Sequence, residues 1–252
     1  MDWNKVKKVI SYSLWGDLAK YRQGAIENCR LAKIYYKDWI SRFYIDKSID
    51  ESFKSKLVDL GAEVIEFDRG VINSGMFWRF TVFSDPSVDI AIIRDTDSRL
   101  SARESLAVNE WLESGKKLHV IRDHPLHGRL IMGGMWGAKA SSLRDIQDQI
   151  VLYSPKDERD IDQVFLEEYI YKKFKRDNVF AHDCFFDFEK QKNTFQINRK
   201  DYEFVGEVFN DIGVRENDFK LIELYEKSAS FRLRIWIESK VRLVRYILKG
   251  NL

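Results

Sequence analysis

Two aspartates, Asp95 and Asp97, follow the apolar segment 90–93 after a single arginine and are separated from each other by one residue. Side chains two positions apart point to the same side of an extended chain, so the two carboxylates could share one hard cation. Such a cation could neutralise the charge that develops when a diphosphate leaves, and Arg94 and Arg99 add positive charge nearby. The D-x-D spacing alone is weak evidence, because acidic residues at strand ends are commonly turn or cap residues.

The aspartate pair is expected at one edge of a sheet, because apolar runs of strand length alternate with helical periods along the chain. The expected strands cover residues 9–14, 39–45, 62–67, 88–93 and 118–121, with a further extended segment at 179–188. The expected helices cover 18–32, 53–60, 73–83, 101–114 and 231–249, and another starts at Ser154 with Ile161, Phe165 and Tyr169 on its buried side. This alternation predicts an α/β fold.

Several boundaries carry their own signals. Ser101 and Glu104 fit a capping box, and Gly115 suits the end of the helix that they begin. Gly61 likewise suits the end of the helix expected at 53–60. The segment 124–139 is rich in Gly, His and Met and shows no clean period, so we expect a long loop that shapes a site.

The composition bounds the class of protein. The 252 residues are 44% hydrophobic and 33% charged with three prolines, which fits one globular domain. A net charge of +2 argues against a general nucleic-acid binder. Cys29 and Cys184 form no C-x-x-C pattern, which argues against a disulfide framework and favours a reducing compartment. No cysteine or carboxylate spacing around the clustered histidines completes a zinc site. The charged start shows no signal peptide, and we expect a cytoplasmic protein.

Four segments match a known pattern. They are Ser11-Tyr-Ser-Leu-Trp-Gly16 with Lys20-Tyr21, Trp78-Arg-Phe80, Arg94-Asp-Thr-Asp-Ser-Arg99, and Val120-Ile-Arg-Asp-His-Pro-Leu-His127 followed by Gly133-Gly-Met-Trp-Gly-Ala-Lys139. With them, residues 9–208 resemble D-x-D-containing glycosyltransferases of the GT-A fold, of a bacterial and viral type. The resemblance implies a Rossmann-like mixed sheet flanked by helices, a catalytic domain over 1–227, and sugar transfer from a nucleoside diphosphate, UDP favoured over GDP, to a glycan or lipid-linked glycan acceptor.

The resemblance also implies a metal site for Mn²⁺ or Mg²⁺. Asp97 would be a direct ligand, Asp95 would contact the ion or the ribose, and His182 would complete the site. The alternative for His182 is a polar residue within a strand, with Asp183 as its competitor for the ligand role. Lys139 would contact the diphosphate, unless it is a surface lysine.

Further residues are implied for the donor. Those for the base and ribose are Ser13, Trp15 and Tyr21, with Arg79 near the phosphates or the sugar. Gly133, Gly134 and Trp136 would face the sugar, because glycines let a backbone approach a ligand beside an aromatic surface. Each of these aromatic residues could instead belong to the core, and the glycine-rich segment could be a tight turn with Trp136 as a core residue.

The catalytic base and the stereochemistry are less constrained. An inverting enzyme needs a carboxylate base, for which Asp123 is the candidate, although Arg122 and His124 could hold it in a structural ion pair. A retaining enzyme lets the departing phosphate take the proton, and the glycine-rich loop favours retention by analogy. The alternatives are a nucleotidyltransferase, for which residues 11–16 lack a basic phosphate loop, and an inert carbohydrate-binding or scaffold protein.

The carboxyl end, residues 228–252, is basic and of helical period. Its apolar side is expected to comprise Trp236, Ile237, Leu243, Val244, Ile247 and Leu248, opposite Arg234, Arg242, Arg245 and Lys249. Such a helix could lie on an anionic membrane and bring the enzyme to lipid-linked acceptors. The alternatives are a helix docked on the domain with solvated cations, or a homodimer interface.

Overall fold

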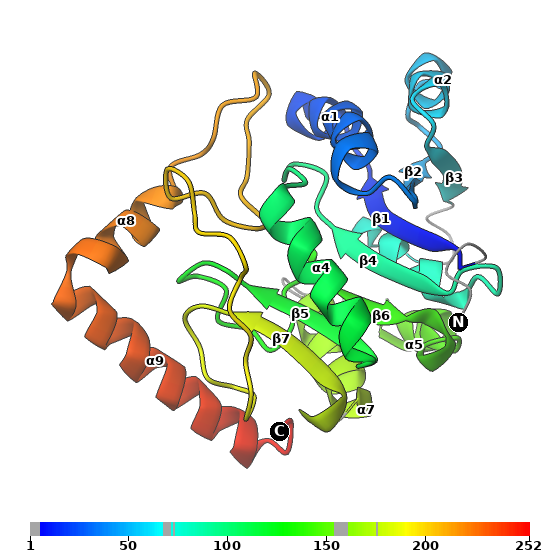
Figure 1. Cartoon of the computed structure of the whole chain (residues 1–252). Helices are drawn as coiled ribbons and strands as arrows, with labels where there is room; N and C mark the ends of the chain where they lie inside the picture. The colour runs from blue at the N-terminus through cyan, green and yellow to red at the C-terminus, as the bar shows by residue number, and fades with distance from the viewer. Residues whose placement is uncertain (1–5, 68–71, 73, 154–160, 175) are drawn as a thin grey trace.

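The computed structural model describes residues 6–67, 72, 74–153, 161–174 and 176–252. Within these residues a seven-stranded sheet has the order β3-β2-β1-β4-β6-β5-β7 (Figure 1). Strand β6 is antiparallel to β4 and β5, and the other neighbours are parallel. The strands are β1 (Lys8–Leu14), β2 (Trp39–Asp46), β3 (Glu63–Phe67), β4 (Ile90–Arg94), β5 (Leu118–Arg122), β6 (Met135–Lys139) and β7 (Val179–Asp183). The α/β mixed sheet expected from the sequence is confirmed.

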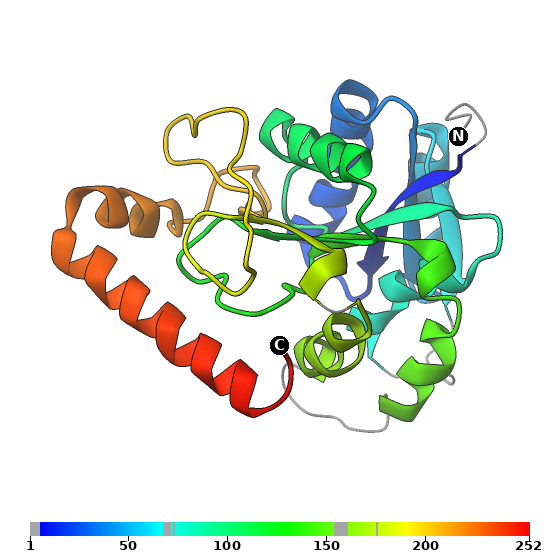
Figure 2. The ribbon, with the colours of Figure 1, turned by 60° about the horizontal axis from the view of Figure 1, so that its bottom comes forward.

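Helices cover both faces of the sheet; in Figure 2, α4 lies above the sheet and α7 below it. The first three helices are α1 (Ala19–Tyr35), α2 (Glu51–Asp59) and α3 (Gly75–Trp78). They are followed by α4 (Ala102–Ser114), α5 (Ile146–Tyr153), α6 (Ile161–Phe165) and α7 (Lys172–Phe174), and by α8 (Phe219–Lys227) and α9 (Ala229–Leu248) near the carboxyl end.

Side-chain alternation along the strands builds one apolar core on each face. In β4, Ile90 and Ile92 join the cluster under α1 and α4, whereas Ala91 and Ile93 join the cluster that contains Trp78 and helices α5 to α7. Successive side chains of a strand point to opposite faces, so this pattern also decides where the residues after β4 point.

The segment 124–139, predicted to be a loop, contains strand β6 at its end. Gly137 lies so close to β4 that an added Cβ would be 2.7 Å from Ile92 and 3.2 Å from Trp111. A strand with small residues at such contacts shows little alternation in sequence, which is why periodicity missed it. Helices α5 and α8 were also not predicted.

The segment 73–83, predicted to be one helix, forms α3 and then a 3-10 helix, Arg79–Ser84, while residue 73 lies outside the described part of the chain. Hydroxyls of β1 hold this junction: Ser11 Oγ donates to the carbonyl of Arg79 at 2.7 Å, and the Arg79 amide donates to Ser13 Oγ at 2.9 Å. Tertiary hydrogen bonds thus replace part of the regular helical pattern.

Other predicted boundaries are confirmed in part. Ser101 Oγ accepts from the Glu104 amide at 3.2 Å, but the Glu104 carboxylate bonds to Arg94 and Tyr36, so only half of the capping box forms. The predicted start at Ser154 lies outside the described residues; the described part, α6, continues as a π-helical segment, Leu166–Tyr171, before α7. The extended segment 179–188 is strand only to Asp183.

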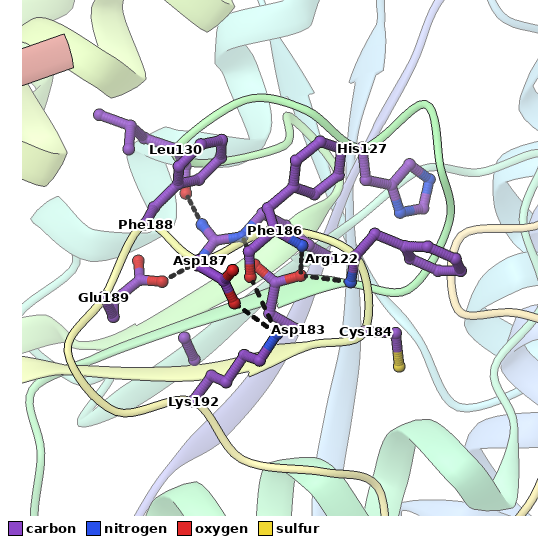
Figure 3. A network of polar contacts seen from close by, with 12 residues as sticks. Arg122, His127, Leu130, Asp183, Cys184, Phe186, Asp187, Phe188, Glu189 and Lys192 are labelled. Carbon is purple, nitrogen blue, oxygen red and sulfur yellow. Dashed lines mark hydrogen bonds and ion pairs between the residues drawn. The ribbon is translucent and has the colours of Figure 1, made fainter. Parts of the chain in front are cut away.

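A buried charged network explains why β7 ends at Asp183 rather than at residue 188 (Figure 3). Asp183 Oδ1 accepts from two amides, at residues 185 and 186, and so turns the chain. Arg122, fully buried in β5, pairs with Asp183 at 2.6 Å and with Glu189, and it donates to the carbonyl of Leu130. Breaking one member of such a network leaves an unpaired buried charge, so these contacts lock β5, β7 and the following loop together.

Helix α9 begins after Ser228, whose hydroxyl accepts from the amide of Phe231. Ile235 and Tyr246 are buried and join the same apolar cluster as α5 to α7. Most of the apolar side expected from the sequence is therefore not the docked side: Trp236, Ile237, Val244, Ile247 and Leu248 are exposed, whereas Leu243 packs against the same cluster. Among the described helices, none has both the length and the apolar character needed to cross a bilayer.

Candidate functional site

A cavity of about 400 Å³ opens at the carboxyl ends of β1 and β4. The strand order reverses here: β2 and β3 lie on one side of β1, and β4 and the later strands lie on the other. Open α/β sheets bind ligands at such a point. The predicted site residues that line it are Ser13, Trp15, Tyr21, Arg79, Asp95, Asp97, Gly133 and Gly134. Residues far apart in the sequence therefore meet here.

A second cavity of about 450 Å³ lies beside it and contains neither aspartate. The two share the segment after β4: Asp97 lines the first cavity, and Arg99 lines the second. We assign the functional site to the smaller of these two cavities, because the aspartate pair, Arg79 and the glycine pair converge there.

Asp95 is positioned by Arg79. The Arg79 guanidinium pairs with the Asp95 carboxylate and also donates to the carbonyl of Arg94 at 3.2 Å. Because the backbone of Arg79 is held by Ser11 and Ser13, β1 indirectly fixes the orientation of Asp95. The Asp95 side chain keeps an exposed fraction of 42% and faces the cavity.

Asp97 is positioned by Lys20 of α1. Lys20 Nζ lies 2.8 Å from Asp97 Oδ2, and the Asp97 side chain is only 11% exposed. Burial and the charge of Asp95 raise the pKa of Asp97 despite this ion pair. Burial is the largest single influence on Lys20 and opposes its charged form, but the hydrogen bond to Asp97 and the negative charge of Asp97 together outweigh burial, so the pKa of Lys20 is raised. Such a site favours additional positive charge.

The turn that carries both aspartates is clamped to β1 and α1. Thr96 Oγ1 donates to the carbonyl of Ser13 at 2.7 Å, and Asn28 Nδ2 donates to the carbonyl of Ser98 at 2.9 Å. An added Cβ on Gly24 would lie 1.9 Å from the carbonyl oxygen of Thr96, so only glycine permits this contact. A glycine within the predicted first helix was a signal that the sequence interpretation passed over.

The glycine pair touches the acidic groups directly. An added Cβ on Gly134 would lie 2.0 Å from Asp95 Oδ2. One on Gly133 would lie 3.0 Å from Asp162 Oδ2 and 2.7 Å from the end of the Gln163 side-chain amide. The backbone at 133–134 thus forms one wall of the cavity and leaves no room for side chains there.

An aromatic side chain, Trp15, also lines this cavity. The Trp15 indole is 39% exposed and stands edge-on to Trp78, with ring centroids 6.2 Å apart. Gly75 lies beneath it, where an added Cβ would be 2.5 Å from the ring. An exposed, fixed indole of this kind can stack on a nucleobase or a sugar.

Asp162 is a site residue that the sequence interpretation missed. It is 5% exposed, lines the cavity, and its Oδ2 lies 3.9 Å from Arg79 Nη2. Beside it, Gln163, in the orientation that satisfies both amide atoms, donates to the carbonyl of Ile131 at 3.0 Å and accepts from the amide of Gly133 at 2.9 Å. In the sequence, Asp162 is only an acidic residue near the start of a helix, which does not indicate a site. Tertiary packing brings it close to Arg79.

Trp136 and Lys139 lie away from the cavity. Trp136 is fully buried and stacks on Phe83 with ring centroids 5.0 Å apart, so it is a core residue. Because β6 is antiparallel to β4, Met135 pairs with Arg94 at the cavity end, and Lys139 pairs with Ile90 at the opposite end. Lys139 donates to the carbonyl of Gly115.

Arg94 and Asp123 are also buried elsewhere. Arg94 is on the α4 face of the sheet, with Nε 2.6 Å from Glu104 Oε1, because alternation turns it away from the Asp95 side. Asp123 is fully buried and accepts from Arg103, from Arg199 at 2.6 Å and from the amide of Val205. These contacts exclude it as the base in this cavity and match the structural alternative, with different partners from those predicted.

His182 is separated from the aspartate pair, since β6 and β5 lie between β7 and β4. Its Nε2 lies 2.6 Å from Glu110 Oε2, and its other ring nitrogen lies 2.9 Å from His119. Among the described residues, no three His, Cys, Asp or Glu side chains are grouped to hold a metal. Asp95 and Asp97 alone remain as the predicted ligands.

Two carboxylates fit a cation that arrives with its substrate. Mg²⁺ and similar ions are commonly held by one or two carboxylates together with phosphate oxygens and water, so a closed protein cage is not required. The raised pKa of Asp97 and the exposed carboxylate of Asp95 match this chemistry. Lys20 and Arg79 would share the site with the ion.

No protein-family model and no curated protein matches the chain. Among solved structures, S. aureus TarS (residues 1–349) matches 75% of this chain with a TM-score of 0.51 and 9% identity, and the chain spans 59% of that structure. A glycosyltransferase involved in the glycosylation of the major capsid of PBCV-1 covers 72% of this chain and 83% of its own, with a TM-score of 0.44 and 11% identity.

The 4-diphosphocytidyl-2C-methyl-D-erythritol synthase from Anaerococcus prevotii covers 71% of this chain and 89% of its own, with a TM-score of 0.49 and 10% identity. At these identities the comparisons bear on the fold alone. With the mixed seven-stranded order, the similarity to TarS shows that the chain has a GT-A-like α/β fold.

Proposed function

We propose that the protein is a divalent-metal-dependent glycosyltransferase that moves a sugar from a nucleoside-diphosphate sugar to a glycan or glycolipid acceptor. The observation that carries the proposal is that Asp95 and Asp97, on one clamped turn, line the same cavity as an exposed indole and a pair of glycines. The GT-A-like fold agrees with a transferase that uses a nucleotide donor.

In this proposal the cavity holds the donor. Trp15 stacks on the base, and Ser13 and Tyr21 lie beside the ribose. Asp95 and Asp97 would hold Mn²⁺ or Mg²⁺, which when bound neutralises charge on the departing diphosphate. Arg79 and Lys20 add fixed positive charge at the same place, where a low dielectric strengthens its effect.

The sugar would lie against Gly133 and Gly134, close to Asp162. Asp162 replaces Asp123 of the sequence interpretation as a further carboxylate at the cavity, beside Asp95 and Asp97. We keep retention as the predicted outcome, in which the departing phosphate takes the proton of the acceptor hydroxyl and Asp162 accepts hydrogen bonds from the donor sugar. The anomeric configuration of the product, read by NMR, tests this.

Thermal unfolding with nucleoside diphosphates, with and without Mn²⁺, tests the proposal, because a ligand stabilises the state that it binds. We expect metal-dependent stabilisation by UDP, followed by GDP, and its loss in Asp97→Asn but not in the control variant Asp89→Asn, whose exposed side chain lies just before β4 and away from the cavity. Stabilisation by nucleoside triphosphates with release of pyrophosphate would indicate a nucleotidyltransferase instead. The absence of any nucleotide response would indicate a binding or scaffold protein.

A further inference from the structure

Helix α9 has two apolar sides, of which only one contacts the domain. Ile235, Ser239 and Tyr246 are at most 6% exposed and face inward. On the opposite side, at the helical spacing of 100° per residue, lies a row that we call the outward face. It consists of Leu233, Ile237, Val241, Val244 and Leu248, with exposed fractions between 47% and 82%.

The outward face is held in place rather than left loose. Tyr246 donates to Glu167 at 2.7 Å, Arg242 donates to the carbonyl of Gly128 at 3.2 Å, and Lys240 donates to Asp187 at 2.9 Å. In Figures 1 and 2, α9 runs along the outside of the molecule, away from the central strands. These contacts fix which side of the helix is presented to its surroundings.

The outward face and its flanks hold a large share of the exposed apolar side chains of the described residues. Of the eighteen exposed large apolar side chains among the described residues, seven lie in α9: the five of the outward face and the flanking Trp236 and Ile247. A contiguous apolar surface of this kind on a folded domain commonly marks an interaction site.

The charges beside this face are mostly positive. Residues 229–249 contain six cations, at positions 232, 234, 240, 242, 245 and 249, and one acidic residue, Glu238. Glu238 pairs with Arg234 at 2.9 Å. Arg245 and Lys249 are exposed and form no ion pair with any described residue.

We propose that the outward face of α9 binds the surface of an anionic lipid bilayer. Its apolar side chains would enter the region of the headgroups and upper acyl chains, while Arg245 and Lys249 meet anionic headgroups. A second copy of the chain suits the face less well, because pairing two such helices would bring like charges together. The inference is independent of the proposed catalytic activity.

Co-sedimentation of the full chain with vesicles tests the proposal, using phosphatidylcholine alone and phosphatidylcholine with phosphatidylglycerol in equal parts. The wild type should bind the anionic vesicles, and added salt should weaken the binding through screening. Ile237→Ser with Val244→Ser should lower the partition coefficient at least tenfold. Arg245→Gln with Lys249→Gln should lower it by about fivefold for each cation removed.

Matched controls keep the test specific. Ile34→Ser with Val58→Ser removes two apolar side chains of similar exposure, 60% and 55%, from α1 and α2, and should bind as the wild type does. Because all of the substituted residues are exposed, thermal unfolding should show every variant folded. Point substitutions are preferred to truncation, since removing α9 would uncover the cluster around Tyr246.

Two results would overturn the proposal. One is equal binding of anionic vesicles by the wild type and the Ile237→Ser, Val244→Ser variant, or no binding by either. The other is a wild-type dimer in analytical ultracentrifugation that the same variant converts to monomer, which would assign the face to a second copy. Nucleotide stabilisation of the same preparations separates this inference from the proposed function.

Discussion

The guanidinium of Arg79 is paired with the carboxylate of Asp95, although the two residues are 16 positions apart. The same guanidinium donates to the carbonyl of Arg94 and lies 3.9 Å from Asp162. One side chain therefore organises two carboxylates at the cavity, and its own backbone is held by β1. This contact makes the site a property of the whole sheet rather than of the D-x-D segment.

Arg79→Lys should lower metal-dependent UDP affinity at least tenfold, because an ammonium group cannot bond to the Asp95 carboxylate and the Arg94 carbonyl in the same fork geometry. Isothermal titration with Mn²⁺ and UDP measures this. Arg144→Lys is the matched control, since Arg144 also donates to several carbonyls, but away from the cavity. Equal loss in both variants would refute the positioning role of Arg79.

Lys20→Gln should strengthen the binding of Mn²⁺ alone and weaken the binding of UDP with Mn²⁺. Lys20 competes with a metal for Asp97, at 2.8 Å, but supplies positive charge to a diphosphate. Titration of Mn²⁺ followed by paramagnetic resonance, with and without UDP, separates the two effects. If both affinities fell together, Lys20 would act only by orienting Asp97.

Gly134→Ala should abolish metal-dependent nucleotide stabilisation, because the new Cβ would lie 2.0 Å from Asp95 Oδ2 and displace that carboxylate. Differential scanning fluorimetry with UDP and Mn²⁺ is the measurement. Gly128→Ala serves as the control, since there the nearest atoms, at 3.1 Å, belong to the flexible Arg242 side chain. A wild-type response in Gly134→Ala would place the metal elsewhere.

Asp123→Asn should affect stability and not donor binding. Asp123 is fully buried and paired with Arg103 and Arg199, so loss of its charge should lower the free energy of unfolding by about 3 kcal/mol or more. Urea unfolding measures this loss, and the stabilisation of the folded fraction by UDP and Mn²⁺ should persist. Lost UDP binding at unchanged stability would restore Asp123 to the active site.

Asp85→Asn should produce a pH-dependent loss of stability. Burial opposes ionisation of Asp85, but hydrogen bonds from Ser87 and Arg42 outweigh burial and lower its pKa from 3.8 to about 2. A depressed pKa stabilises the folded state above the unfolded-state value, and this contribution is lost as the pH falls toward 2. Because the group is partly exposed, we expect about 1 kcal/mol at neutral pH.

Urea unfolding from neutral pH down to pH 2 checks this expectation. The difference between the wild type and Asp85→Asn should be constant above the unfolded pKa of 3.8 and should shrink between that value and about 2. Asp89→Asn, on the exposed end of the same turn, should show a smaller difference. A difference that grew on acidification would contradict the assigned sign.

Sequence patterns were sufficient wherever the determinant was local. The apolar run 90–93 predicted a buried strand with Asp95 and Asp97 at its end, and strand periodicity placed β1, β2 and β3 within one or two residues. Glycines at positions 133 and 134 predicted a close backbone approach. These features depend on neighbouring residues, whose side-chain period and conformational freedom can be read directly.

Only the tertiary structure decided the partners of those residues. The reversal of β6 carries Lys139 to the far end of β4, alternation turns Arg94 toward Glu104, and two intervening strands separate His182 from the pair. Packing also brings Asp162 to Arg79. Strand order and direction follow from the burial of many residues at once, so no single segment contains them; the sequence alone determined the acidic turn, and the fold determined what surrounds it.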